Sequence, residues 1–105
     1  MVSRIAIVGV GQVGAATAYA LILGSVVNEL LLVDLKADLR DCQVRDLSDV
    51  AYNSKSGTRV RPATHREAGQ CDIVIITAGS KHSIGKAFDD GRDLITWLFC
   101  WRGPI

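Results

Sequence analysis

A glycine-rich turn between two apolar segments constrains the fold of this chain more than any other feature. Residues 9–14 read GVGQVG and follow the apolar run 5–8, which has the length and composition of a buried strand. A helical pattern of apolar and small residues begins at Val13, and a second apolar run, 30–33, ends at Asp34, about twenty residues beyond the last glycine. This order of strand, glycine turn, helix, strand and acidic residue is typical of a βαβ unit and predicts dinucleotide binding.

Each residue of the turn has a physical role in such a site. Gly9 permits the tight turn out of the strand, Gly11 lets a pyrophosphate approach the backbone because it has no Cβ, and Gly14 lets the helix pack close to the strand. The backbone N–H groups around Gln12 and Val13, at the start of the helix, are expected to face the phosphates.

Asp34 predicts which dinucleotide is bound. Its carboxylate can accept hydrogen bonds from the ribose hydroxyls of the adenosine, and its charge repels a 2′-phosphate. The expected cofactor is therefore NAD rather than NADP. A glycine-rich turn that binds no nucleotide is the alternative, and the spacing and the context argue against it.

The uncharged stretch 5–28 allows a second interpretation, because it is long enough to span a membrane and Arg4 precedes it as in a signal peptide. Glycines and polar residues interrupt the stretch and would weaken a lipid-facing helix. A buried parallel strand followed by a helix of small residues explains the absence of charge better.

Length, charge and cysteines exclude several classes of protein. The 105 residues are enough for one small domain, and the net charge of +1 predicts neither a nucleic acid nor a membrane surface as partner. The cysteines Cys42, Cys71 and Cys100 form no metal-binding or redox motif. We therefore expect no metal site and a reducing, cytoplasmic location.

The alternation of helix and strand continues beyond Asp34. Residues 36–53 have the pattern of an amphipathic helix, residues 58–61 that of a short strand ended by Pro62, and residues 72–77 that of a buried strand. The predicted fold is α/β, a Rossmann-type parallel sheet of about four strands in the order 3-2-1-4 that forms an incomplete half of a doubly wound fold. The last of these strands is expected to lie at the sheet edge.

Four motifs in this order resemble the N-terminal half of the L-lactate and malate dehydrogenases, with the lactate enzymes the more similar: residues 4–15 (RIAIVGVGQVGA), 32–34 (LVD), 45–47 (RDL) and 75–79 (IITAG). The resemblance implies an NAD-binding domain that serves hydride transfer to and from a 2-hydroxy acid, in an enzyme that is a homo-oligomer. It also implies that the backbone of Ala78 and Gly79 lies along the cofactor. His65 falls near the adenine end in the family, although an exposed loop histidine is an equally good interpretation.

The chain departs from the family pattern after Gly79. The family carries an arginine that polarises the substrate carbonyl a few residues past a glycine; Gly85 matches the glycine, but Phe88 occupies the arginine position. Ser83 stands near the position that separates lactate from malate enzymes, where Gln or Arg is usual, so the choice of substrate is not predicted. Arg92 is better interpreted as a solvated surface charge than as a displaced substitute.

The family's catalytic histidine, its aspartate partner and its carboxylate-binding arginine have no match, since neither His65 nor His82 lies in such a motif. We therefore assign no catalytic residue and expect the chain by itself to be inactive. The chain divides into an NAD-binding half-domain, 1–85, and a divergent tail, 86–105. A truncated or frame-shifted gene product explains the tail, and so does a short helix over residues 93–99 packed on the sheet edge.

Two other functions stay open at this point. One is a non-catalytic nucleotide-binding or subunit-interaction remnant whose helix 36–53 contacts a partner subunit. The other is a different Rossmann-type dehydrogenase, which the IITAG motif disfavours.

Overall fold

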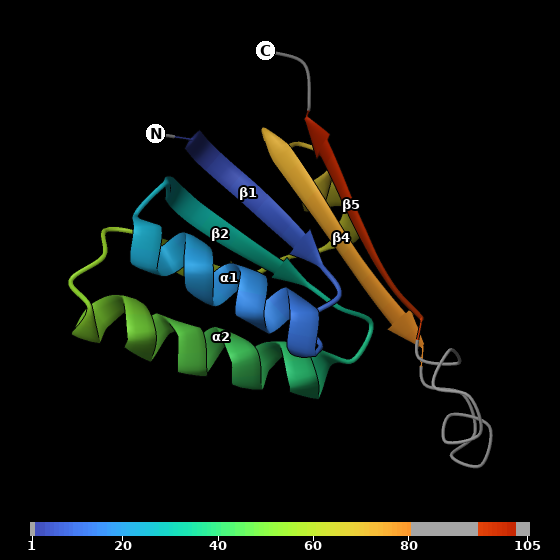
Figure 1. The fold of residues 1–105 in the computed structure, drawn as a ribbon, viewed down its shortest axis with the longest axis horizontal. Helices are drawn as coiled ribbons and strands as arrows, with labels where there is room; N and C mark the ends of the chain where they lie inside the picture. The colour runs from blue at the N-terminus through green and yellow to red at the C-terminus, as the bar shows by residue number, and fades with distance from the viewer. Residues whose placement is uncertain (1, 81–94, 103–105) are drawn as a thin grey trace.

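The computed structural model describes residues 2–80 and 95–102, which form one five-stranded sheet with helices on both faces (Figure 1). Helices α1 and α2 cover one face, and the short α3 lies on the other (Figure 1). The elements in chain order are β1 (Val2–Val8), α1 (Gln12–Gly24), β2 (Val27–Val33), α2 (Ala37–Asn53), β3 (Arg59–Pro62), α3 (His65–Ala68), β4 (Ile73–Ser80) and β5 (Ile95–Arg102).

The first four strands of the sheet are parallel, and β1 is central among them. The strand order is β3-β2-β1-β4-β5, and Ile7 of β1 is paired with Leu32 of β2 on one side and with Ile75 of β4 on the other. The predicted order 3-2-1-4 of a Rossmann-type parallel sheet is thereby confirmed.

Strand β5 contradicts two expectations from the sequence. The prediction that β4 forms the sheet edge is wrong, because β5 pairs antiparallel along all of β4, from Ile73 opposite Arg102 to Ser80 opposite Ile95. The helix considered over residues 93–99 is also wrong, since residues 95–102 are extended. An edge strand offers unpaired backbone N–H and C=O groups, and the β-branched and aromatic residues of 95–102 favour the extended conformation that pairs with them.

The uncharged stretch 5–28 folds as the end of β1, the glycine turn, α1 and the start of β2. Within residues 2–80 and 95–102, no helix is long and apolar enough to cross a membrane. Within this stretch, the strand residues Ile5, Ala6, Ile7 and Val27 and the helix residues Gly14, Ala18 and Ile22 are buried.

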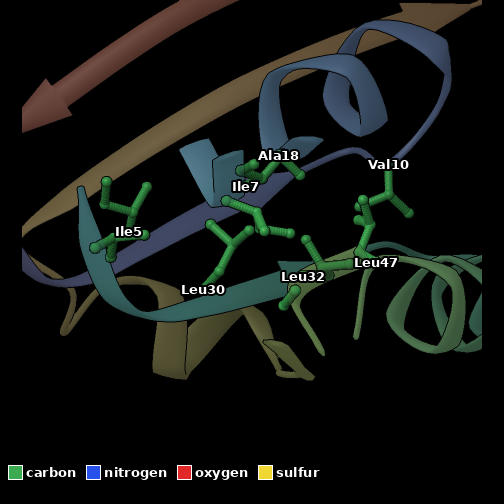
Figure 2. Packing of buried hydrophobic residues seen from close by; sticks show 10 residues of the cluster. Ile5, Ile7, Val10, Ala18, Leu30, Leu32 and Leu47 are labelled. Atoms are coloured by element: carbon green, nitrogen blue, oxygen red, sulfur yellow. The ribbon is translucent and has the colours of Figure 1, made fainter. Parts of the chain in front are cut away.

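Two apolar clusters, one on each face of the sheet, form the core. The cluster beneath α1 and α2 takes alternate positions of β1 and β2 and residues of both helices (Figure 2), among them Ile5, Ile7, Leu30, Leu32, Ala18 and Leu47. The cluster on the face of α3 includes the intervening positions Ala6, Leu31 and Val33, together with Ala68 of α3 and Val74 of β4. Because successive residues of a strand point to opposite faces, an unbroken apolar run can fill both layers.

Helix α3 was not expected from the sequence, although residues 64–67 (THRE) carry its signal. The hydroxyl of Thr64 accepts a hydrogen bond from Glu67 N at 3.2 Å, and the Glu67 carboxylate accepts one from Thr64 N at 3.1 Å. This reciprocal pair is a capping box, which starts a helix. His65 is the first residue of α3 and is exposed.

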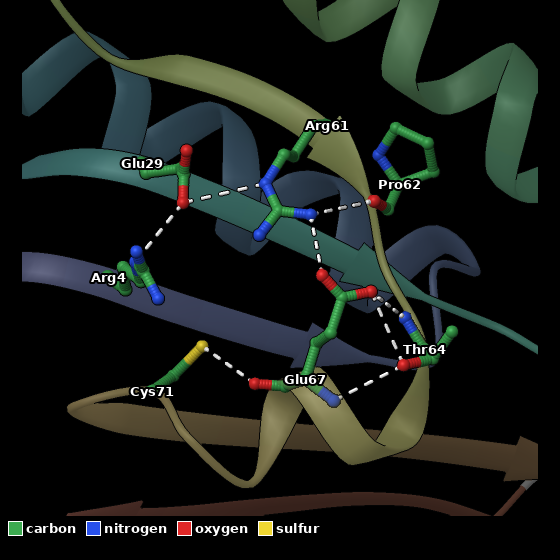
Figure 3. Close-up of polar contacts among 7 residues, drawn as sticks. All are labelled: Arg4, Glu29, Arg61, Pro62, Thr64, Glu67 and Cys71. Carbon is green, nitrogen blue, oxygen red and sulfur yellow. Dashed lines mark hydrogen bonds and ion pairs between the residues drawn. The ribbon is translucent and has the colours of Figure 1, made fainter.

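A chain of ion pairs crosses the sheet on the side of α3 (Figure 3). Glu29 Oε1 of β2 lies 3.3 Å from Arg4 Nε of β1 and 3.5 Å from Arg61 Nε of β3. Arg61 continues the chain to α3, with its Nη1 2.9 Å from Glu67 Oε2. The hydrogen bond from Arg61, together with that from the Thr64 backbone, holds the pKa of Glu67 below its ordinary value of 4.5. These contacts join three strands and α3.

The lowered pKa of Glu67 predicts an acid-sensitive contribution to stability. Its carboxylate stabilises the fold fully above pH 4.5, and this contribution is lost as the pH falls through the lowered pKa. Glu67→Gln keeps a capping acceptor but cannot titrate, so urea unfolding should show a shallower loss of stability in the acid range. Arg61→Gln should reproduce most of this change, because it removes the main cause of the shift. An unchanged pH dependence in both variants would contradict the assignment.

Candidate functional site

The glycine turn lies at the carboxyl end of the central strand, where the order of the strands reverses. From β1 the chain proceeds to β2 and β3 on one side, and it then returns to β4 on the other. In open α/β sheets, ligands bind at such a switch point, outside the carboxyl ends of the strands. The last β1–β4 pair is Val8 with Ile76, so the part of β4 that contains Ala78 and Gly79 extends past the end of β1.

Gly9 and Gly14 are needed for packing. The backbone of Gly9 has φ +94°, which L side chains rarely adopt, and a Cβ there would overlap the carbonyl oxygen of Thr77. A Cβ on Gly14 would overlap the carbonyl oxygen of Gly9 and lie 2.8 Å from Thr77 Oγ1. Glycine is therefore required at both positions, because only then can the turn and the start of α1 lie this close to β4.

Gly11 differs from the other two glycines because the protein leaves space beside it. It is exposed, and a Cβ at this position would meet no atom of residues 2–80 or 95–102 within 4 Å. Gly11 is the N-cap of α1, which has no side-chain cap and no acidic residue in its first turn. No side chain of this helix therefore caps the N–H groups of Gln12 and Val13 or neutralises the positive end of the helix dipole. That end lies beside the space at Gly11. The arrangement fits a pyrophosphate.

Asp34 is half-buried and follows the end of β2. Its Oδ2 accepts a hydrogen bond from Val10 N at 2.8 Å, and its Oδ1 accepts one from Lys36 N at 2.9 Å. The sequence did not indicate these bonds, which tie the glycine turn to the end of β2. A carboxylate oxygen can accept a second hydrogen bond, so Asp34 retains capacity for a ribose hydroxyl.

Thr77 is the residue of this region that the sequence analysis missed. Its side chain is buried in β4, and its hydroxyl donates to the carbonyl oxygen of Gly9. The sequence does carry a signal, because Thr77 is a hydroxyl residue that directly follows the apolar run 73–76. A buried polar side chain requires a hydrogen-bond partner, so a threonine at this position indicates a contact with another part of the chain. Ala78 and Gly79 directly follow Thr77 and pair through their backbone with Trp97 and Thr96 of β5.

The structure thus brings Gly9, Gly11, Gln12, Val13, Gly14 and Asp34 together at the turn. The loop residues considered for the substrate (His82, Ser83, Gly85, Phe88 and Arg92) lie outside the described residues. In the part of the chain that is described, no group of three His, Cys, Asp or Glu side chains could hold a metal ion.

Comparisons with known proteins agree with this architecture. A family model for the lactate/malate dehydrogenase NAD binding domain matches residues 3–96. L-lactate dehydrogenase A of Rhizopus oryzae is 49% identical over 84 residues, which are 80% of this chain and 26% of that protein. An L-lactate dehydrogenase of Clostridium botulinum is 36% identical over 84 residues, with the same two shares.

Solved structures give the same result. The minor L-lactate dehydrogenase of Enterococcus mundtii, in its ligand-bound form, matches with a TM-score of 0.73 and 33% identity over 80% of this chain and 27% of that chain. This chain therefore spans 26% of the length of the curated relatives that it matches. The match of the family model over residues 3–96, on a parallel sheet with the expected strand order, shows that the chain belongs to the NAD-binding domain of the lactate/malate dehydrogenase family, whose members are NAD-dependent oxidoreductases.

Proposed function

We propose that this chain binds the adenosine and pyrophosphate of NAD at the turn after β1, as part of an oxidoreductase that acts on the CH–OH group of a 2-hydroxy acid. The observation that carries the proposal is the open space beside Gly11, at the uncapped start of α1 and near the carboxylate of Asp34. The names of the relatives favour L-lactate as the substrate. Such an enzyme acts in carboxylic acid metabolism.

Each site residue has one role in this proposal. Gly11 leaves room for the pyrophosphate, and the N–H groups of Gln12 and Val13 donate hydrogen bonds to it. Asp34 accepts hydrogen bonds from the ribose hydroxyls, and its charge disfavours a 2′-phosphate. The backbone of Ala78 and Gly79 lies along the cofactor. When bound, NAD supplies the group that exchanges a hydride with the substrate carbon.

We extend the proposal to a cytoplasmic homo-oligomer. The thiols of Cys42 and Cys71 are free, as is usual in a reducing compartment. We also retain the division into an NAD-binding unit, 1–85, and a divergent tail, 86–105. The antiparallel direction of β5 in an otherwise parallel sheet supports that division.

The first prediction from the proposed function separates the glycine that leaves space for a ligand from the glycine that packs. Gly11→Ala should change the free energy of unfolding by less than about 1 kcal/mol, because no atom meets the new Cβ, whereas Gly9→Ala should cost more than that through strain. Calorimetry should find NAD affinity reduced about tenfold or more by Gly11→Ala. Gly57→Ala is the control, since its Cβ also meets nothing and it lies in the turn before β3. Unchanged NAD affinity in Gly11→Ala would contradict the proposal.

The second prediction concerns the choice of cofactor. Asp34→Ala removes a ribose acceptor and a repulsive charge, but it also frees Val10 N and Lys36 N, so affinity for both dinucleotides should fall. The informative quantity is the ratio of the NAD and NADP dissociation constants, in which the shared effect of the turn cancels. We expect the difference in binding free energy between NAD and NADP to narrow by about 1.5–3 kcal/mol, the range for a hydrogen bond to a charged group. An unmutated chain that bound NADP more tightly than NAD would contradict this role.

The third prediction is that the 105-residue chain alone does not oxidise NADH with pyruvate or oxaloacetate. Neither His65 nor His82 matches the family's acid–base histidine. Loss of general acid–base catalysis costs about 10²–10⁴ in rate, and loss of substrate positioning costs more. Absorbance of NADH provides the assay, with Asp34→Ala as the control. Turnover that scales with the protein and disappears in that variant would show that catalytic residues have been overlooked.

A further inference from the structure

We infer that Thr77 is a positioning residue of the dinucleotide site, whose hydroxyl holds the glycine turn in the conformation that leaves the start of α1 open to a pyrophosphate. The inference rests on the NAD-binding function proposed above. Thr77 acts here through the turn, because it is buried and its hydroxyl donates to the Gly9 carbonyl.

The peptide unit between Gly9 and Val10 is held from both neighbouring strands. Its carbonyl group accepts a hydrogen bond from Thr77 Oγ1 of β4, and its N–H group donates to Asp34 Oδ2, beyond the end of β2, at 2.8 Å. Gly9 N, one peptide earlier, donates to Val33 O at 2.8 Å. Three consecutive polar groups of the turn therefore have partners, and Thr77 supplies the only one of the three that comes from β4.

The orientation of this peptide determines where the ligand-facing part of the turn lies. Gly11 follows Val10 directly and is the N-cap of α1. Gly9, with φ +94°, is a flexible position, because glycine populates many backbone conformations that other residues do not. Rotation of the peptide would break the bonds to Thr77 and Asp34 together and would displace Gly11. Without the bond from Thr77, the hydrogen bonds that remain at Gly9 N and Val10 N come from the β2 side alone.

The Thr77 side chain also fills the space that the two packing glycines leave. Its Oγ1 would lie 3.4 Å from a Cβ on Gly9 and 2.8 Å from one on Gly14. Thr77 is 5% exposed, so a hydroxyl without a hydrogen-bond partner there would lower the stability of the fold. Its partner is the Gly9 carbonyl. A valine has nearly the same shape as threonine but cannot donate, and it would leave the carbonyl without this bond.

Thr58 offers a matched control at the other end of the sheet. It is also 5% exposed, and its hydroxyl donates to a backbone carbonyl, that of Val27, at 2.7 Å. Val27 is the first residue of β2, whereas Asp34 follows the last. A variant at Thr58 therefore removes a similar buried hydrogen bond at a distance from the glycine turn.

The experiment compares Thr77→Val, Thr77→Ser and Thr58→Val by calorimetry with NAD and with ADP-ribose, alongside urea unfolding. Thr77→Val should weaken the binding of both ligands about tenfold, which is near the upper end of the net contribution of one intramolecular hydrogen bond. Thr77→Ser keeps the hydroxyl and should restore affinity close to that of the unmutated chain. Thr58→Val should lower stability without changing either dissociation constant. If Thr77→Val does not fold, Thr77→Ala removes the hydroxyl without added bulk and should show the same loss.

Two results would overturn the inference while the unmutated chain binds NAD. One is unchanged affinity in Thr77→Val or, if that variant does not fold, in Thr77→Ala; the other is an equal loss in Thr58→Val. Amide chemical shifts of Val10 and Gly11 in the ligand-free chain give an independent readout: displacement in Thr77→Val and recovery in Thr77→Ser support the inference, and unchanged shifts oppose it. If the unmutated chain binds neither ligand, the proposed function fails, and the shifts alone decide whether Thr77 holds the turn.

Discussion

The close approach of the turn after β1 to strand β4 is the constraint on which the rest of the structure depends. The absence of side chains at Gly9 and Gly14 lets the turn and the start of α1 lie directly against Thr77. Because β1 is also paired with β2, this contact determines where α1 begins and toward which edge of the sheet its N-terminus points. A larger residue at either glycine would push the helix away from the sheet. The geometry of the proposed site is thus a consequence of how tightly the helix and the sheet pack.

Polar groups occupy opposite ends of a sheet whose middle is apolar. The ion pairs of Arg4, Glu29 and Arg61 join three parallel strands, with Arg4 and Glu29 directly paired in the β1–β2 register. At the carboxyl ends of the strands, Asp34 and Thr77 hold the turn through backbone groups. The ion pairs connect the strands. The hydrogen bonds of Asp34 and Thr77 hold the turn at the proposed binding site. Their separation leaves the apolar middle free to form the core.

The two faults in the predicted fold, at β5 and α3, have different causes. Apolar residues over 95–102 suit either a strand or a helix packed on the sheet, and only pairing with β4 decides between them. An antiparallel strand needs only a loop to reach its partner, whereas a parallel one needs a crossover connection. Helix α3 is too short to show a periodic pattern, so its capping residues were its only signal. Local sequence is weakest where an element is short or where its partner decides its conformation.

The sequence alone predicted the βαβ unit and the acid at Asp34, because apolar periodicity and glycine spacing are properties of neighbouring residues. The strand order 3-2-1-4 was predicted from the rules by which such units connect, and the structure confirms it. Only the tertiary structure decided that Asp34 accepts from Val10 N and that Thr77 donates to Gly9. Thr77 and Gly9 are 68 residues apart, and Asp34 and Val10 are 24 apart. A hydrogen-bond partner so distant along the chain is chosen by the position of folded strands, and no local pattern of residues encodes it.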